Sequence, residues 1–86
     1  MPYTVDVHKR AEKFLRSLKD AALYRRLRSA INSLSSGPHA PGTVKLAGSE
    51  GIFHLSVRDY RILYHVQDDI LRVLVIEIGH RREVYR

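Results

Sequence analysis

Hydrophobic and polar residues alternate along three segments of the chain, Tyr3 to Val7, Ile52 to Val57 and Tyr60 to Val66. A fourth segment, Leu71 to Ile78, is a run rich in Val, Ile and Leu. Alternation is typical of a strand with one buried face, and a continuous apolar run is typical of a strand covered on both faces. We therefore expect four strands, with Gly79 ending the last of them.

Between Lys9 and Pro38 the apolar residues recur every three or four positions, which is the period of a helix with one buried face. Asp20 is expected to cap a second helix, because its carboxylate can accept hydrogen bonds from the first N–H groups. Gly37 and Pro38 are expected to end that helix. The two apolar stripes predict a helical hairpin; they are Ala11, Phe14, Leu15 and Leu18, then Leu23, Leu27, Ala30, Ile31 and Leu34.

With a further short strand at Val44-Lys45-Leu46, the element order is β-α-α-β-β-β-β. This order predicts an α+β fold, an antiparallel sheet of four to five strands with the helical hairpin on one face. The 86 residues leave room for one domain, residues 1–86, since a chain of this size buries only about 60–65% of its unfolded surface.

The start of the chain lacks the apolar stretch of a signal peptide. The longest uncharged apolar run, Val73 to Ile76, is far shorter than the roughly 20 residues that span a bilayer. We expect a soluble cytoplasmic protein with no membrane partner.

The chain carries fifteen Lys and Arg against nine Asp and Glu, a formal charge of +6. Most of the cations are arginines, which bind phosphate through two parallel hydrogen bonds. The charge alone favours nucleic acid and an acidic protein equally as partners. The cluster Arg25-Arg26-Arg28 lies on the predicted solvated face of the second helix and could meet an acidic partner. The absence of cysteine excludes a disulfide, a thiolate zinc site and a cysteine nucleophile.

A two-residue turn at Arg58-Asp59 would fix the register of the strands on either side. Val57 then lies opposite Tyr60, and Ser56 opposite Arg61. Directly opposed residues share a face of the sheet. The face under the helices would hold Phe53, Leu55, Val57, Tyr60, Ile62 and Tyr64, and the other face His54, Ser56, Arg61, Leu63 and His65.

The second face could bind and cleave a phosphodiester if the tail with Arg81, Arg82 and Tyr85 folds back beside it. Arginines neutralise phosphate oxygens, histidine transfers protons near neutral pH, and tyrosine does so if nearby cations lower its pKa. The alternatives are a solvated His54, an Arg61 that only pairs across the strands, and a Tyr85 that only packs. We expect no metal site, because His8, His39 and His65 lack ligand spacing and no carboxylate pair accompanies them.

Four motifs in this chain resemble a known family. They are Tyr3-Thr4-Val5 before two helices, Lys45-Leu46-Ala47-Gly48, Val57-Arg58-Asp59-Tyr60-Arg61-Ile62-Leu63-Tyr64, and Ile78-Gly79-His80-Arg81-Arg82-Glu83-Val84-Tyr85. In these motifs the chain resembles the RelE/ParE superfamily of toxins from bacterial and archaeal toxin–antitoxin modules, over nearly its full length. The family would have the same order of elements.

The resemblance implies a RelE-type toxin that cleaves mRNA in the ribosomal A site without a metal, by attack of a 2′-hydroxyl on the adjacent phosphate. Arg61 and Arg81 match family arginines that stabilise charge on the phosphate, and Tyr85 matches the tyrosine that acts as general base. Two usually basic positions fall on His54, which keeps an acid/base or phosphate role, and on Ser56, which has lost the charge. His80 is a further acid/base candidate, and the residues expected to contact RNA are Lys45, Ser56, Arg58, His80 and Arg82.

Three functions remain open within this resemblance. The first is the ribosome-dependent endonuclease, which Arg61, Arg81 and Tyr85 favour. The second is a ParE-like inhibitor of DNA gyrase, which the missing basic pair at His54 and Ser56 keeps open, and the third is an inactive member that binds only its antitoxin. The expected partners are a cognate antitoxin, the ribosome with its mRNA, and operator DNA through the antitoxin; no cofactor is implied.

Overall fold

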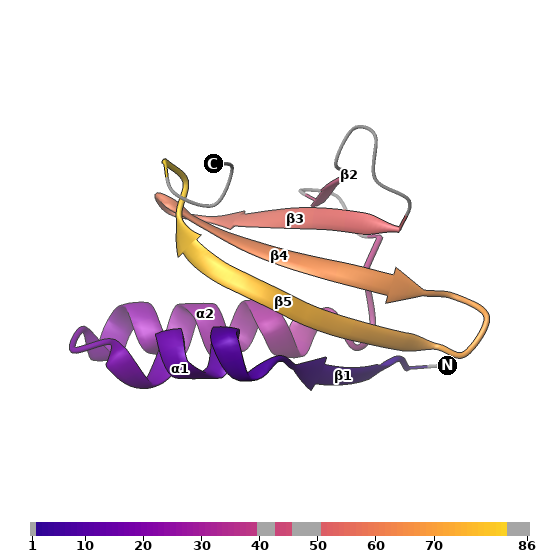
Figure 1. The fold of residues 1–86 in the computed structure, drawn as a ribbon, viewed down its shortest axis with the longest axis horizontal. Coiled ribbons are helices and arrows are strands. Elements are labelled where there is room, and N and C mark those ends of the chain that lie inside the picture. Colours follow the sequence, from indigo (N-terminus) through magenta and orange to yellow (C-terminus); the bar gives the residue numbers. More distant parts are fainter. Residues whose placement is uncertain (1, 40–42, 46–50, 83–86) are drawn as a thin grey trace.

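The computed structural model describes residues 2–39, 43–45 and 51–82, and its elements follow the predicted order (Figure 1). Leu46, expected in the second strand, lies outside the described residues. Within those ranges, neither helix has the length and apolarity needed to cross a membrane. The elements are β1 (Thr4–Val7), α1 (Lys9–Ser17), α2 (Ala21–Ser33), β2 (Thr43–Lys45), β3 (Ile52–Val57), β4 (Tyr60–Gln67) and β5 (Arg72–His80).

Both helices begin at a side chain that accepts hydrogen bonds from the first turn. The Asp20 carboxylate accepts from the N–H groups of Ala22 and Leu23, at 3.0 and 3.1 Å, as predicted. At the start of α1, Nδ1 of His8 accepts from the N–H of Arg10 at 3.1 Å, a cap that the pattern did not predict. These bonds satisfy donors that a helix start otherwise leaves without partners.

The hairpin of α1 and α2 covers one face of the sheet, below the strands in Figure 1. The predicted stripes supply the helix side of the core. The strands supply the other side, and Phe53, Leu55, Val57 and Tyr60 pack around it. The helix face of the sheet is therefore the one predicted, and the buried core consists of Ala11, Leu15, Leu23, Leu27, Ile31, Leu34, Ile62, Tyr64, Val66, Val73, Val75 and Ile78.

The five strands lie in the order β1-β5-β4-β3-β2. Three neighbouring pairs are antiparallel, as predicted, but β1 and β5 are parallel, with Thr4 beside Arg72 and Val7 beside Val75. A parallel pair needs a long connection, and here the connection from β1 to β5 contains every other element, from α1 to β4. The expectation of a wholly antiparallel sheet is therefore wrong for this pair.

The last strand differs from its prediction in two ways. It continues through Gly79 to His80, because β4 still offers pairing partners there, Arg61 and Tyr60. It is also covered on one face rather than two, since Val73, Val75 and Ile78 are buried while Leu74, Ile76 and Glu77 are half-buried. A bulge opposite Leu63 and Tyr64 inserts one extra residue, Ile76, into this strand.

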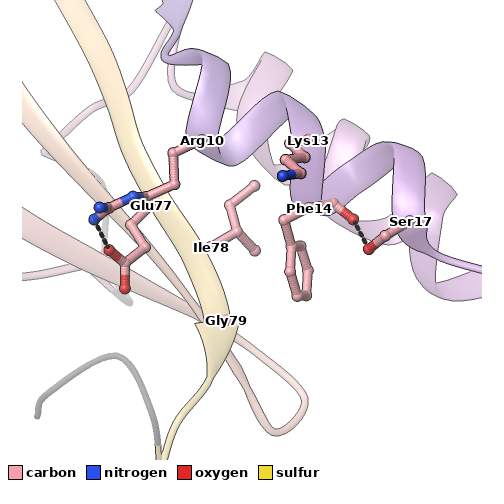
Figure 2. A pocket seen from close by; sticks show the side chains of 7 residues that line it. All are labelled: Arg10, Lys13, Phe14, Ser17, Glu77, Ile78 and Gly79. Atoms are coloured by element: carbon pink, nitrogen blue, oxygen red, sulfur yellow. Dashed lines mark hydrogen bonds and ion pairs between the residues drawn. The ribbon is translucent and has the colours of Figure 1, made fainter.

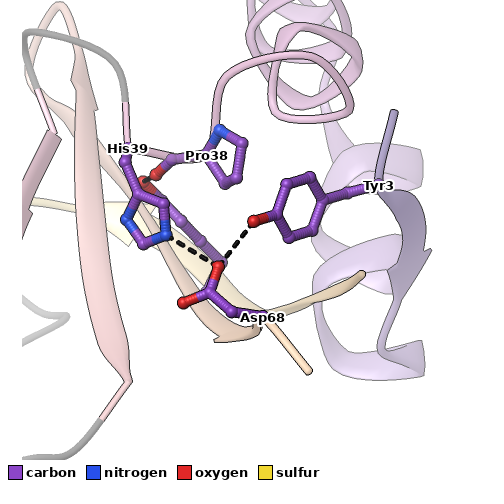
Figure 3. Close-up of polar contacts among 5 residues, drawn as sticks. Tyr3, Pro38, His39 and Asp68 are labelled. Atoms are coloured by element: carbon purple, nitrogen blue, oxygen red, sulfur yellow. Dashed lines mark hydrogen bonds and ion pairs between the residues drawn. The ribbon is translucent and has the colours of Figure 1, made fainter. Parts of the chain in front are cut away.

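Three segments far apart in the sequence meet at Asp68 in the turn between β4 and β5 (Figure 3). The Tyr3 hydroxyl donates to the Asp68 carboxylate at 2.5 Å, and Nε2 of His39 lies 3.0 Å from the same oxygen. Beside them, the buried Tyr64 hydroxyl donates to the carbonyl of Pro38 at 2.8 Å. These bonds tie the residues before β1 and after α2 to the end of the sheet.

We expect the Asp68 contacts to give the fold an acid-sensitive contribution to stability. The hydrogen bonds from Tyr3 and His39 hold the pKa of Asp68 below its ordinary value. A lowered folded-state pKa stabilises the fold above the ordinary carboxylate pKa of about 4, and this contribution disappears as the pH falls through the lowered value. Urea unfolding of the wild type and of Asp68→Asn should therefore differ at neutral pH and converge in acid; parallel curves would contradict this.

Candidate nucleic-acid interface

The β3–β4 hairpin has the register predicted from the two-residue turn. Ser56 lies opposite Arg61, His54 opposite Leu63 and Val57 opposite Tyr60. Because opposed residues share a face, one polar set lies on the face of the sheet away from the helices. We call this the outer face; its predicted residues are His54, Ser56, Arg61, Leu63 and His65.

Arg61 is a fixed cation of the outer face and is half-buried. Its Nη1 donates to the Ser56 hydroxyl on the neighbouring strand. Its buried Nε has no hydrogen-bond partner among the described residues. On the other side Arg61 lies opposite Gly79, which has no side chain to cover it. Ser56 therefore holds the guanidinium in place, and its positive charge can act on an anion bound at the outer face.

His54 lies on the same face, one residue pair along the hairpin from Arg61 and Ser56. Burial lowers the pKa of its imidazole, and the charge of Arg61 lowers it further. Both causes disfavour the protonated ring. At neutral pH the ring is therefore uncharged and able to accept a proton.

Arg81 lies beside the β3–β4 turn. Its N–H donates to the carbonyl of Asp59 at 2.8 Å, and its Nη1 lies 4.0 Å from the Asp59 carboxylate. These contacts tie the chain after β5 to the Arg58-Asp59 turn, which only Tyr60 separates from Arg61. Arg82 is exposed, and its N–H donates to Nδ1 of His80 at 3.3 Å; Tyr85 lies outside the described residues.

Two residues expected to contact RNA lie away from the outer face. Lys45 pairs with Phe53, and His80 pairs with Tyr60, so both share the side of the sheet that carries the helices. The His80 ring makes an edge contact with Tyr60 at 5.7 Å between ring centroids. The outer-face position of β2 is taken instead by the exposed Val44, opposite His54.

The sequence reasoning missed one carboxylate, Glu77. The bulge at Ile76 places Glu77 opposite Leu63 and thus on the outer face, two residues before Gly79, the partner of Arg61. Diagonal neighbours of this kind lie about 7–8 Å apart. No sequence signal marks a bulge within so apolar a strand.

Glu77 is paired with a cation from outside the sheet. Nη1 of Arg10 on α1 lies 2.8 Å from the Glu77 carboxylate (Figure 2). The pair closes one end of a groove of about 520 Å³ between α1 and β5, into which Phe14 and Ile78 point. Arg10 balances Glu77. Arg72, which lies opposite Gln67 and thus also on the outer face, is balanced by Asp6 at 3.4 Å. Arg61 therefore keeps a charge that no ion pair among the described residues balances.

The described residues contain no cluster of side chains that could hold a metal ion. Within 2–39, 43–45 and 51–82, no three His, Asp or Glu side chains lie close enough together to hold an ion.

The sequence of the chain matches known toxins along nearly its whole length. The sequence model of a family described as the ParE toxin of the type II toxin–antitoxin system parDE matches residues 5–85. Toxin RelG of Mycobacterium tuberculosis is 30% identical over 86 residues, which cover 100% of this chain and 99% of RelG.

Solved toxin structures share the fold along nearly the whole chain. The archaeal RelE–RelB complex from Pyrococcus horikoshii OT3 matches with a TM-score of 0.82 and 28% identity, covering 98% of this chain and 100% of that one. The intact Escherichia coli RelBE toxin–antitoxin complex matches with a TM-score of 0.78 and 28% identity, covering 91% and 95%. The chain therefore belongs to the RelE/ParE superfamily of toxins from type II toxin–antitoxin modules.

Proposed function

We propose that this toxin is a ribosome-dependent mRNA endonuclease that cleaves in the A site without a metal. The observation that carries the proposal is Arg61, a guanidinium that Ser56 fixes on the outer face, opposite Gly79, which has no side chain to cover it. Such a donor, held before the substrate arrives, stabilises negative charge that develops on a phosphate. The ribosome would supply the alignment of the reacting groups, which by itself can lower the barrier substantially.

In the proposed reaction the 2′-hydroxyl oxygen attacks the adjacent phosphorus. The bond from phosphorus to O2′ forms and the bond to O5′ breaks, leaving a 2′,3′-cyclic phosphate and a 5′-hydroxyl. Arg61 and Arg81 stabilise the charge on the phosphate oxygens. Following the family resemblance, Tyr85 takes the proton from the 2′-hydroxyl, and His54 is a second group that can accept one. The leaving 5′-oxygen takes up one proton from water, so that protons balance over the reaction.

The lowered pKa of His54 predicts a specific pH dependence. If the neutral ring is the active form, cleavage continues below the ordinary histidine pKa of about 6.5 and declines as the pH falls through the lowered value. Single-turnover cleavage measured across this range should show that decline in the wild type, and His54→Ala should be slower without it. An unchanged acid limb in His54→Ala would remove His54 from the reaction.

We also propose that a cognate antitoxin neutralises this toxin, because two of the similar structures are RelE–RelB and RelBE complexes.

Gyrase inhibition is the second candidate function. It is favoured by the match to the ParE family model and by an outer face on which Glu77, Ser56 and the ion-paired Arg72 accompany Arg61.

Primer extension on a defined mRNA, with programmed ribosomes and a ribosome-free control, tests the proposal. Cuts confined to the A-site codon would support it. Cuts without ribosomes would indicate a free ribonuclease, and no cuts in either lane would favour the gyrase inhibitor, to be tested by DNA supercoiling. Inactivity in both assays would indicate a toxin-fold protein that only binds its antitoxin.

A further inference from the structure

The structure divides the arginine cluster of α2 into residues with different surroundings. Arg28 is engaged: its Nη2 lies 2.6 Å from the Glu12 carboxylate, and its Nε donates to the Tyr24 hydroxyl at 3.1 Å. Arg26 instead lines a groove between α2 and the β3–β4 hairpin. Arg25 is exposed and is not among the residues lining that groove.

The groove, which we call the α2 groove, has a volume of about 430 Å³ and the chemistry of an anion site. Arg26 on the helix and Arg58 on the turn both line it, and no ion pair within the described part of the chain involves either. None of its lining residues is acidic. The hydroxyl groups of Ser29 and Ser56 add further donors, whereas the hydroxyl of Ser33 donates to the carbonyl of Ala30 at 2.6 Å.

The backbone of Arg58 adds an independent observation. Its φ is 54°, in the left-handed region that residues with a side chain rarely adopt. Glycine would occupy this position without strain. A two-residue hairpin turn requires a positive φ at its first residue, and here that position carries a guanidinium that lines the groove.

The α2 groove is continuous with the outer face through one residue. Ser56 lines the groove, and its hydroxyl accepts the hydrogen bond of Arg61. An extended chain of phosphates that contacts Arg61 could therefore pass over Ser56 to Arg58 and Arg26. The groove lacks the aromatic or large apolar anchors that stabilise most protein interfaces, since its apolar lining is limited to Ala30 and Val57.

We propose that the α2 groove binds an RNA phosphodiester next to the one held at Arg61. This inference rests on the proposed function and extends the RNA-binding surface from the sheet onto α2. The phosphate could belong to mRNA or to ribosomal RNA, and binding to a short single-stranded RNA and to ribosomes with an empty A site distinguishes the two sources.

The test compares Arg26→Ala with the matched control Arg25→Ala in the full chain. Arg26→Ala should weaken binding to at least one of the two probes about tenfold and reduce the salt dependence by about 0.7 in log–log slope, the effect of losing one phosphate contact to a single strand. Arg25→Ala should stay within about twofold, because it lies outside the groove. Equal losses in both variants would indicate a general charge effect and overturn the proposal.

The variant Arg58→Gly distinguishes the effect of the backbone conformation on stability from the effect of the side chain on RNA binding. Removing the side chain should relieve the backbone at φ 54° and raise the thermal midpoint, while RNA binding weakens.

Unchanged RNA binding in both Arg26→Ala and Arg58→Gly would overturn the proposal for the α2 groove alone and leave the proposed endonuclease activity intact. Weaker binding to the co-purified antitoxin with unchanged RNA binding would assign the groove to a protein interface. A wild type that binds neither RNA nor ribosomes would overturn the endonuclease as well.

Discussion

Replacing Arg61 by alanine is expected to slow ribosome-dependent cleavage by about 10²–10³-fold, the usual loss when one preorganised donor to a transition-state charge is removed. The guanidinium is already fixed by Ser56, so its deletion removes a positioned charge rather than a mobile one. Single-turnover cleavage of mRNA on programmed ribosomes measures the effect. The fold should persist, because Arg61 is only half-buried and lies outside the core.

Two further variants sharpen this result. Arg61→Lys keeps the charge but loses the planar fork, so its rate should fall between the wild type and alanine. Arg81→Ala should also abolish most cleavage while leaving antitoxin binding intact. If Arg61→Ala and Arg81→Ala both cleave at the wild-type rate, the outer face is not the active site.

Leu27→Ala is expected to destabilise the fold by about 3–5 kcal/mol, the range for leucines replaced in well-packed cores. Leu27 is fully buried on α2, where the helix meets the sheet. A chain of this size is stable by only about 4–13 kcal/mol, so this one change would remove a large part of that stability. Urea unfolding followed by circular dichroism measures it.

Val44→Ala provides the matched control for the loss of apolar side-chain volume. Val44 is 54% exposed at the edge strand, so its truncation should change the free energy of unfolding by less than about 0.5 kcal/mol. Similar losses at Leu27 and Val44 would mean that the hairpin does not pack on the sheet as described.

The hairpin that carries Arg61 could be predicted because its register depends on local information. A two-residue turn at Arg58-Asp59 allows one pairing, and the alternation of apolar residues then assigns both faces. The cap at Asp20 was predictable for the same reason, since the side chain and its N–H partners are neighbours in the sequence.

The position of Glu77 could not be predicted, because one inserted residue reverses the alternation of a strand. Up to Val75 the buried residues of β5 are odd-numbered, and after the bulge Ile78 is buried instead. The faces of Lys45 and His80 depend likewise on where β2 pairs and where β5 ends, which are tertiary properties. The ion pair of Arg10 with Glu77 joins residues 67 positions apart.

The position of β5 in the sheet has a consequence for the synthesis of the chain. This strand lies between β1 and β4, although it is the last of the five to be made. Until Arg72–His80 has left the ribosome, β1 has no partner and the apolar side of the helices lacks Val73 and Val75. A partly translated chain therefore cannot complete its core, and a folded toxin forms only after β5 has left the ribosome.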